Sequence, residues 1–211
     1  MISKATSRPT AEECCPVPGN DPLFQQYHDE EWGVPQHEDT VYYEKVCLEG
    51  FQSGLGWRTI LHRREAFREL FAGFNMAVVA RYSTVQLSAL ISDSRIIRNK
   101  KKIASAINNA QRAVELREEY GTLARFFWQF EPDAHTRPNT VDRKWLAANS
   151  QTAESSAMAK ALKLRGWSFV GPTNMYALMQ ALGIVNDHVE GCHRREQIDK
   201  MRASFNRPRQ T

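Results

Sequence analysis

The sequence has no hydrophobic run long enough to cross a membrane. Hydrophobic residues make up 42% of the chain, but no part of it approaches the roughly 18 consecutive apolar residues that a transmembrane helix requires. The N-terminal stretch MISKATSRPTAEE also lacks the apolar core of a secretory signal peptide. These absences predict a protein of the cytoplasm with no membrane partner.

Cysteine is scarce, with four residues in a chain of 211. So few cysteines argue against a disulfide framework in a cytoplasmic protein. Cys47 stands within an apolar helical pattern and is expected to be a small core residue. The other three lie at the two ends of the chain, Cys14 and Cys15 near the start and Cys192 near the finish.

Alternating strand patterns and internal repeats are absent, whereas helical spacing of apolar residues recurs throughout the sequence. We therefore predict an all-α fold. The length suits one domain with a full core, assigned to 14–192 between a flexible extension at 1–13 and a basic, disordered tail at 193–211. Polar residues and two prolines predict a long surface connection at 131–152. Helices are expected at 22–30, 39–53, 58–72, 84–92, 99–119, 122–130, 154–165 and 173–184.

Histidine and cysteine occur in pairs near each end of the chain. In NDHVEGC, His188 and Cys192 are four residues apart, which places both on one face of a helix within reach of one ion. Cys15 precedes His28 by thirteen residues, and the four side chains make a Cys2His2 set suited to tetrahedral zinc. Four protein ligands leave no open position, so this zinc would be structural. Spacing alone equally allows two unrelated pairs, and Cys14 could replace Cys15.

The charge of the chain is nearly balanced at +4, but basic residues gather in RIIRNKKK at 95–102. This short segment joins two stretches of helical spacing, as in a helix-hairpin-helix motif. Backbone N–H groups at the start of the second helix would then hold a DNA phosphate without reading sequence. A solvated basic surface is the alternative. The basic side chains expected at the phosphate are Arg98, Lys100, Lys101 and Lys102.

A glutamate interrupts the apolar face predicted for 39–53. Glu49 follows Val46 by three residues and Tyr42 by seven, so its carboxylate is expected to point inward. A buried carboxylate is costly unless it is paired or used. A buried arginine or backbone N–H groups would make it structural, and a binding site would make it functional. Four other large apolar side chains are assigned to core packing, namely Trp32, Met175, Met179 and Leu182.

Five segments in order resemble the 3-methyladenine DNA glycosylase I family, the alkylation-repair branch of the helix-hairpin-helix glycosylases. Short motifs seldom agree five times in order by chance, and together they cover most of residues 15–192. The segments are DPLFQQYHDEEWGVP (21–35), CLEGFQSGLGW (47–57), IIRNKKKI (96–103), LKLRGWSFVGPT (162–173) and ALGIVNDHVEGC (181–192).

The resemblance implies roles for particular residues of this chain. A structural zinc ion would be bound by Cys15, His28, His188 and Cys192. A base pocket would be built from Tyr27, Glu49 and Trp57. The wedge that enters the DNA would be Gly54 and Leu55.

The resemblance further implies monofunctional base-excision repair, in which hydrolysis of the N-glycosidic bond releases 3-methyladenine from alkylated double-stranded DNA. The nucleotide would be extruded from the duplex. Leu55 would fill the vacated stack, and Tyr27 and Trp57 would sandwich the base. N3-methyladenine is positively charged, so aromatic faces and the Glu49 carboxylate would both favour it over adenine. No protein partner is implied, and we expect a monomer.

Three positions depart from the pattern of this family. Val17 stands where a tryptophan is common, Gly56 where a serine is usual and Arg95 where a glycine is frequent. Arg95 is expected to add a phosphate contact, and Gly56 to make the wedge more flexible. The lost aromatic side chain at Val17 motivates an alternative function, a DNA-binding relative with altered specificity or no excision. A zinc hydrolase is disfavoured by the closed ligand set.

Overall fold

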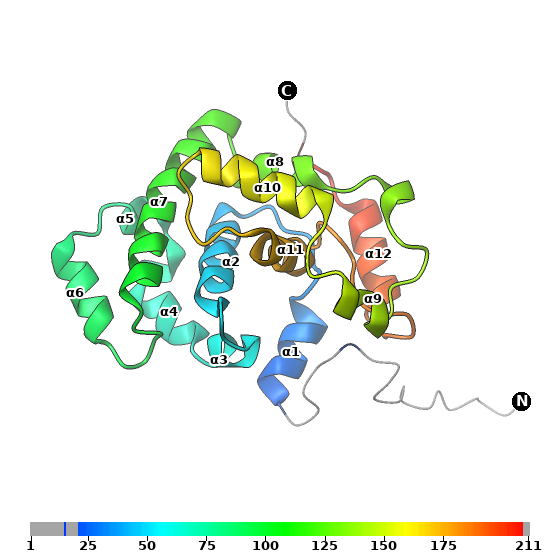
Figure 1. Ribbon diagram of the computed structural model, residues 1–211, viewed down its shortest axis with the longest axis horizontal. Coiled ribbons are helices and arrows are strands. Elements are labelled where there is room, and N and C mark those ends of the chain that lie inside the picture. Colours follow the sequence, from blue (N-terminus) through cyan, green and yellow to red (C-terminus); the bar gives the residue numbers. More distant parts are fainter. Residues whose placement is uncertain (1–14, 16–20, 209–211) are drawn as a thin grey trace, which may run out of the picture.

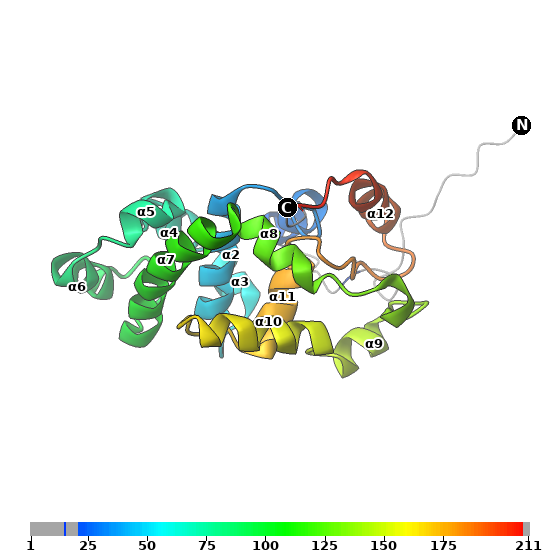
Figure 2. The same ribbon diagram turned by 90° about the horizontal axis from the view of Figure 1, so that it is seen from above.

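The computed structural model describes Cys15 and residues 21–208, and within these residues it contains helices but no strand (Figures 1 and 2). The all-α prediction is confirmed for this part of the chain. The α-helices are α1 (Pro22–Glu30), α2 (Asp39–Gln52), α3 (Trp57–Leu61), α4 (Arg64–Leu70), α5 (Met76–Val79), α6 (Thr84–Ser92), α7 (Lys100–Tyr120), α8 (Leu123–Phe127), α9 (Arg143–Ala148), α10 (Ala153–Leu164), α11 (Pro172–Ala181) and α12 (Arg195–Ser204). Short 3-10 helices are η1 (Ala72–Phe74), η2 (Trp128–Phe130) and η3 (Ala134–Thr136).

Most of the long helices lie where apolar spacing predicts them. Helices α1, α2, α6, α7, α10 and α11 match their expected bounds to within three residues at each end. The helix expected at 58–72 is instead broken into α3 and α4, because Arg63 has non-helical backbone angles. Neither glycine nor proline marks this break in the sequence. The helix expected at 122–130 tightens into 3-10 geometry after α8.

The connection at 131–152 is less irregular than predicted, because it contains η3 and α9. Asp142 caps α9 by accepting a hydrogen bond from the backbone N–H of Trp145 at 2.7 Å. Arg137 from the same segment forms an ion pair with buried Asp187. The connection is thereby attached to the turn that follows α11.

Helix α2 lies at the centre of the molecule, packed against α11 and α7 (Figures 1 and 2). Its first turns are held by two fully buried tyrosines whose hydroxyl groups are satisfied. Tyr43 donates to the carbonyl oxygen of Ala106 on α7 at 2.8 Å. Tyr42 accepts from Trp128 Nε1 at 2.7 Å and donates to the carbonyl oxygen of Gln36 at 2.9 Å. These bonds fix the position of α2, which carries Glu49. Met175, Met179 and Leu182 are fully buried in the same core, as predicted.

A close backbone approach joins the turn after α11 to the segment that follows α1. Gly183 has a φ of +69°, and a Cβ there would stand 2.4 Å from the carbonyl oxygen of Gly33. Only glycine fits both the conformation and the space. The segment that contains His188 and Cys192 therefore passes directly beside the segment that follows α1.

The prediction of a disordered tail is wrong for residues 195–204, which form α12. This helix buries Ile198 completely. Beyond it, the Phe205 ring stacks on Trp128 with centroids 4.7 Å apart. Arg202 and Arg207 both bind the Glu131 carboxylate. The basic charge of the tail, which suggested a solvated end, is used in these ion pairs.

Ile198→Ala is expected to lower the free energy of unfolding by about 2–4 kcal/mol, because it deletes methylene groups from a fully enclosed position. Met201→Ala on the same helix is the control. That side chain is 40% exposed, and its truncation is expected to cost less than about 1 kcal/mol. Urea unfolding of the three proteins measures both values. Equal losses for the two variants would show that α12 is not packed as described.

Candidate functional site: a metal cluster beside an aromatic cavity

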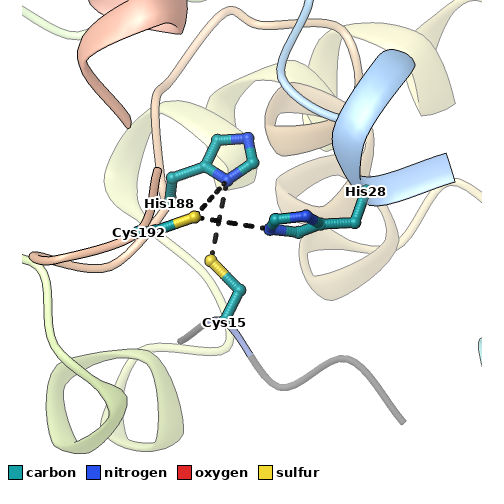
Figure 3. A group of neighbouring side chains, drawn as sticks. All are labelled: Cys15, His28, His188 and Cys192. Carbon is teal, nitrogen blue, oxygen red and sulfur yellow. Dashed lines mark hydrogen bonds between the residues drawn. The ribbon is translucent and has the colours of Figure 1, made fainter. Parts of the chain in front are cut away.

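Two cysteines and two histidines from opposite ends of the chain meet in one buried cluster (Figure 3). The ligand atoms of Cys15, His28, His188 and Cys192 all lie within 4.8 Å of one another. Cys192 Sγ is 3.4 Å from His188 Nδ1 and 3.6 Å from His28 Nε2. Cys15 Sγ is 3.6 Å from His188 Nδ1. His188 and Cys192 lie in a turn and not on the predicted helix, since the chain reverses at Gly191, where φ is +85°.

These distances fit a tetrahedral zinc ion. With Zn–S bonds of about 2.3 Å and Zn–N bonds of about 2.0–2.1 Å, a tetrahedral ion holds sulfur and nitrogen about 3.5 Å apart. The sulfur–nitrogen separations in the cluster have this length. Contacts with Cys15, and then with the two histidines, lower the pKa of the Cys192 thiol despite its burial. The thiolate is the form that binds metal. The alternative ligand Cys14 lies outside the described residues.

Hydrogen bonds on the far side of each imidazole determine which nitrogen faces the cluster. His28 Nδ1 is 2.7 Å from Asp29 Oδ1, and His188 Nε2 is 3.1 Å from the carbonyl oxygen of Trp32. Both oxygens are acceptors, so each requires an N–H on that side of the ring. His28 Nε2 and His188 Nδ1 are therefore left to bind a metal, in the manner usual for histidine ligands.

A cavity of about 190 Å³ lies beside the cluster, between α1, α2, α3 and α11. Its walls are largely aromatic and apolar, and Glu49 is the one carboxylate among the described residues that line it. This size suits a single ring system better than a large ligand. The lining residues are Cys15, Phe24, Tyr27, His28, Trp32, Glu49, Gln52, Trp57, Ala177 and Gln180.

Tyr27 and Trp57 both line the cavity, but they do not form the predicted sandwich. Their ring centroids are 5.2 Å apart with the planes inclined by 46°. Aromatic rings in direct contact have centroids about 4.5–7 Å apart, so no base fits between these two rings as they stand. The sandwich prediction is wrong for this arrangement. A base in the cavity would instead lie against both rings.

Asp21 joins the helix that carries Tyr27 to the helix that carries Trp57. Its buried carboxylate caps α1 and accepts hydrogen bonds from Arg58 Nε at 2.7 Å and His62 Nε2 at 2.8 Å. The hydrogen bond from His62 is the main reason that the pKa of Asp21 is lowered. The two aromatic walls of the cavity are therefore held at a fixed separation by one carboxylate.

The Glu49 carboxylate is buried in the cavity wall without a partner. The side chain is 5% exposed, and within the described part of the chain it forms no hydrogen bond or ion pair. The structural alternatives, a buried arginine or backbone N–H donors, are thus not realised. Burial raises the pKa of Glu49 to about 8, and the nearby Lys45 ammonium partly offsets this effect. A group of this kind is typical of a binding or catalytic site.

Several cavity residues were not predicted from the sequence, although helical periodicity points to some of them. Phe24 precedes Tyr27 by three positions on α1, and Gln52 follows Glu49 by three on α2, so each shares a face with a predicted residue. Trp32, which was assigned to packing, lines the cavity and contacts the His188 ring edge-on. The indole N–H of Trp57 is buried without an acceptor among the described residues.

The groups of the basic hairpin between α6 and α7 are used differently than predicted. Arg98, Lys100 and Lys101 are exposed. Asn99 caps α7 by accepting from the N–H groups of Lys101 and Lys102, so these two amides are not free for a phosphate. The Lys102 ammonium donates to the carbonyl oxygens of residues 51 and 53. The prediction that Lys102 contacts a phosphate is therefore wrong, because its ammonium group bonds within the protein.

The predicted wedge lies in the turn between α2 and α3, between the cavity residues Gln52 and Trp57. Leu55 is 40% exposed. Gly54 has a φ of +78°, which favours glycine, and a Cβ added at Gly54 or Gly56 would meet nothing within 4 Å. Arg95 of the hairpin forms ion pairs with Asp93 and Glu69. Its guanidinium group is therefore not free for the predicted phosphate contact. The remaining departure, Val17, lies outside the described residues.

Comparison with known proteins accounts for this combination of features. The sequence profile of the methyladenine glycosylase family matches residues 17–195. The chain is 39% identical over 181 residues to DNA-3-methyladenine glycosylase 1 of Escherichia coli strain K12, which covers 85% of this chain and 95% of that protein. The chain belongs to the methyladenine glycosylase family. It is also 34% identical over 178 residues to DNA-3-methyladenine glycosylase of Haemophilus influenzae, covering 84% and 95%.

Solved structures of methyladenine glycosylases share the fold. A crystal structure of 3-methyladenine DNA glycosylase I superposes with a TM-score of 0.78 at 38% identity, covering 85% of this chain and 97% of that one. A variant of 3-methyladenine DNA glycosylase I in complex with 3-methyladenine has a TM-score of 0.73 at 25% identity, covering 83% and 94%. The family match ends at residue 195, so α12 lies beyond it.

The raised pKa of Glu49 predicts a pH-dependent stability that Glu49→Gln removes. Between its usual pKa of 4.5 and about 8, the folded protein keeps a proton that the unfolded chain releases. Raising the pH through this window therefore lowers the stability of the parent. We expect the melting temperature of the parent, relative to that of Glu49→Gln, to fall from pH 5 to pH 8.5. Parallel melting curves across this range would mean that Glu49 is ionised in the folded state.

Proposed function

We propose that this protein is a DNA-3-methyladenine glycosylase that hydrolyses the N-glycosidic bond of the damaged nucleotide in base-excision repair. The observation that carries the proposal is Glu49, an unpaired carboxylate in an aromatic cavity of single-base size. Exposed Leu55 lies in the turn between the cavity residues Gln52 and Trp57, and Lys102 of the basic segment bonds the same turn at Ser53. The names of the relatives from two bacteria agree with this activity.

The cavity selects the base through charge and ring contacts. A methylated adenine in DNA carries a positive charge, which the faces of Tyr27 and Trp57 attract. Glu49 accepts a hydrogen bond from the exocyclic amine and becomes ionised as the cation approaches, because an opposite charge favours the charged carboxylate. The unsatisfied indole N–H of Trp57 provides one donor to the base or to a bound water. Neutral adenine gains none of the charge interaction.

The chemistry requires little acid catalysis, because a cationic purine is already an activated leaving group. The Glu49 carboxylate stabilises the positive charge that develops on the sugar as the bond breaks, and water completes the hydrolysis. No lysine lines the described cavity, so no amine is placed to attack the sugar. We therefore expect a monofunctional enzyme that leaves an abasic site in an intact strand.

The DNA partner is double-stranded and is held without sequence readout. Extrusion of a nucleotide costs a few kcal/mol and is easiest for a damaged base. Leu55 enters the gap, in the manner of apolar side chains that unstack base steps. Arg98, Lys100 and Lys101 contact phosphates of the backbone. The described core closes within one chain, so we expect the enzyme to act as a monomer.

The metal cluster is proposed to hold one zinc ion with a structural role. Four buried side chains supply ligands, which leaves no position for a substrate. Cys15 and His28 come from the start of the domain, whereas His188 and Cys192 follow α11. His28 is the neighbour of Tyr27 on α1, so the metal would fix the helix that forms one wall of the cavity. Its contribution is to folding and positioning.

The proposed activity is tested by incubating the protein with methylated duplex DNA and separating the released bases by chromatography. We expect 3-methyladenine to appear while 7-methylguanine stays in the DNA. Glu49→Gln keeps the shape of the side chain and removes the charge, and we expect it to lower the excision rate on the order of tenfold to a hundredfold. Absence of any released base from a DNA-binding parent would favour the non-excising relative that Val17 suggested. Unchanged excision by Glu49→Gln would exclude the proposed role of Glu49.

The zinc proposal predicts one ion per chain by atomic absorption of protein purified without added metal. His188→Ala should reduce the zinc content and lower the melting temperature, since metal binding contributes to folding. His193→Ala is the matched control, because His193 reaches Asp29 but is not one of the four clustered ligands. Full zinc content in His188→Ala would show that the four residues are not the ligand set.

A further inference from the structure

The loop that carries Leu55 is held from two sides at its first residue. The carbonyl oxygen of Ser53 accepts a hydrogen bond from Lys102 Nζ at 2.6 Å, and that of Phe51 accepts from the same ammonium at 2.8 Å. The Ser53 hydroxyl accepts from Asn174 Nδ2 at 2.9 Å, and Asn174 also donates to the carbonyl oxygen of Phe169 at 2.8 Å. The loop is thereby attached to α7 and to α11.

The Lys102 ammonium is unusual because it is enclosed without an acidic partner. Lys102 is 9% exposed, and among the described residues its ammonium bonds only these two carbonyl oxygens. They stand at the C-terminal end of α2, where helix carbonyls are unpaired and the helix dipole favours a cation. Burial lowers the pKa of Lys102. An enclosed charge with no counter-ion is costly. This cost indicates that the Lys102 ammonium has a role other than keeping the surface soluble.

Beyond Ser53 the loop has no comparable support. A Cβ added at Gly54 or Gly56 would meet nothing within 4 Å. The backbone N–H of Leu55 donates to the carbonyl oxygen of Gln52 at 2.6 Å, which closes the turn onto the end of α2. The place of the Leu55 side chain is therefore determined by how residues 51–53 are held.

We propose that Lys102 is a positioning residue that joins the DNA-binding hairpin to the Leu55 wedge, an inference that rests on the proposed function. Lys102 stands in the first turn of α7, next to exposed Lys100 and Lys101. When the hairpin binds the phosphate backbone, Lys102 holds Phe51 and Ser53 at a fixed position relative to the hairpin through two charge-assisted hydrogen bonds. Leu55 then enters the duplex at a fixed distance from the bound phosphates, and the extruded base reaches Glu49 at the other end of the same turn.

Lys102→Met tests this role because methionine keeps a long apolar stem and removes both hydrogen bonds. The first readout is the fluorescence of 2-aminopurine placed beside an abasic-site analogue in duplex DNA, which rises when Leu55 unstacks the base step. We expect the rise to be largely lost at saturating protein. The second readout is steady-state excision, in which kcat should fall about tenfold to a hundredfold with a much smaller change in KM.

Two variants separate positioning from phosphate binding. Lys101→Met removes the same charge one residue earlier, from an exposed position. We expect it to raise KM and to reduce the salt dependence of DNA binding. Lys102→Arg retains donors on a long stem, and it should recover part of the fluorescence rise and of kcat.

A milder variant guards against loss of folding in Lys102→Met, which circular dichroism and zinc content report. Ser53→Ala removes only the hydroxyl, and Asn174 keeps its bond to Phe169. It should lower the fluorescence rise and kcat by about twofold to fivefold. The inference is overturned if folded Lys102→Met, or Ser53→Ala, gives the parent's fluorescence rise and kcat. If the proposed function is wrong, the parent itself releases no 3-methyladenine. The fluorescence readout does not depend on excision, so it still compares the parent with the variants.

Discussion

The unpartnered Glu49 carboxylate is the feature on which the rest of the site depends. Burial penalises the ionised form of this carboxyl group, which raises its pKa to about 8 and keeps it protonated at neutral pH. Tyr42 and Tyr43 fix the first turns of α2 through hydrogen bonds to η2 and α7. Lys102 fixes its last turn. On the proposed function, this carboxyl group becomes ionised when a cationic base enters the cavity, and this is the physical basis of selection for a charged base over adenine.

The cluster of two cysteines and two histidines supports one side of the cavity, where Cys15 and His28 are part of the lining. His28 is the neighbour of Tyr27 on α1, and His188 contacts Trp32. The turn that carries His188 and Cys192 is held in place by α12, since Asn186 bonds the Arg195 carbonyl oxygen and the Asp199 carboxylate. Helix α12 thereby reinforces the turn that carries His188 and Cys192. Loss of the Cys2His2 cluster, or of the bonds from Asn186 to α12, is therefore expected to displace α1. Displacement of α1 would move one wall of the base cavity.

Local sequence patterns predicted the helices that carry the site. The resemblance to the glycosylase family predicted which of their residues form it. The inward position of Glu49 followed from helical spacing alone, because α2 is long and its apolar face continuous. The contact between Tyr27 and Trp57 could not be predicted, since their separation is set by Asp21 across α1 and α3. Lys102 was misassigned for a similar reason. A run of basic residues shows charge but not which member turns inward to the carbonyl groups at the end of another helix. Helix α12 was missed because its Arg202 is paired with Glu131, which is distant in the sequence.

The most direct test is the ionisation state of Glu49 with and without a cationic base. Carboxyl carbons labelled with carbon-13 report ionisation by chemical shift, and the Glu49 signal is assigned by its absence in Glu49→Gln. In the free protein at neutral pH, we expect Glu49 to be protonated, with a pKa of about 8. Addition of the permanently cationic 3,9-dimethyladeninium should shift the signal to the ionised form, and adenine should not. A signal that is ionised in the free protein, or that ignores the cation, would contradict the central claim.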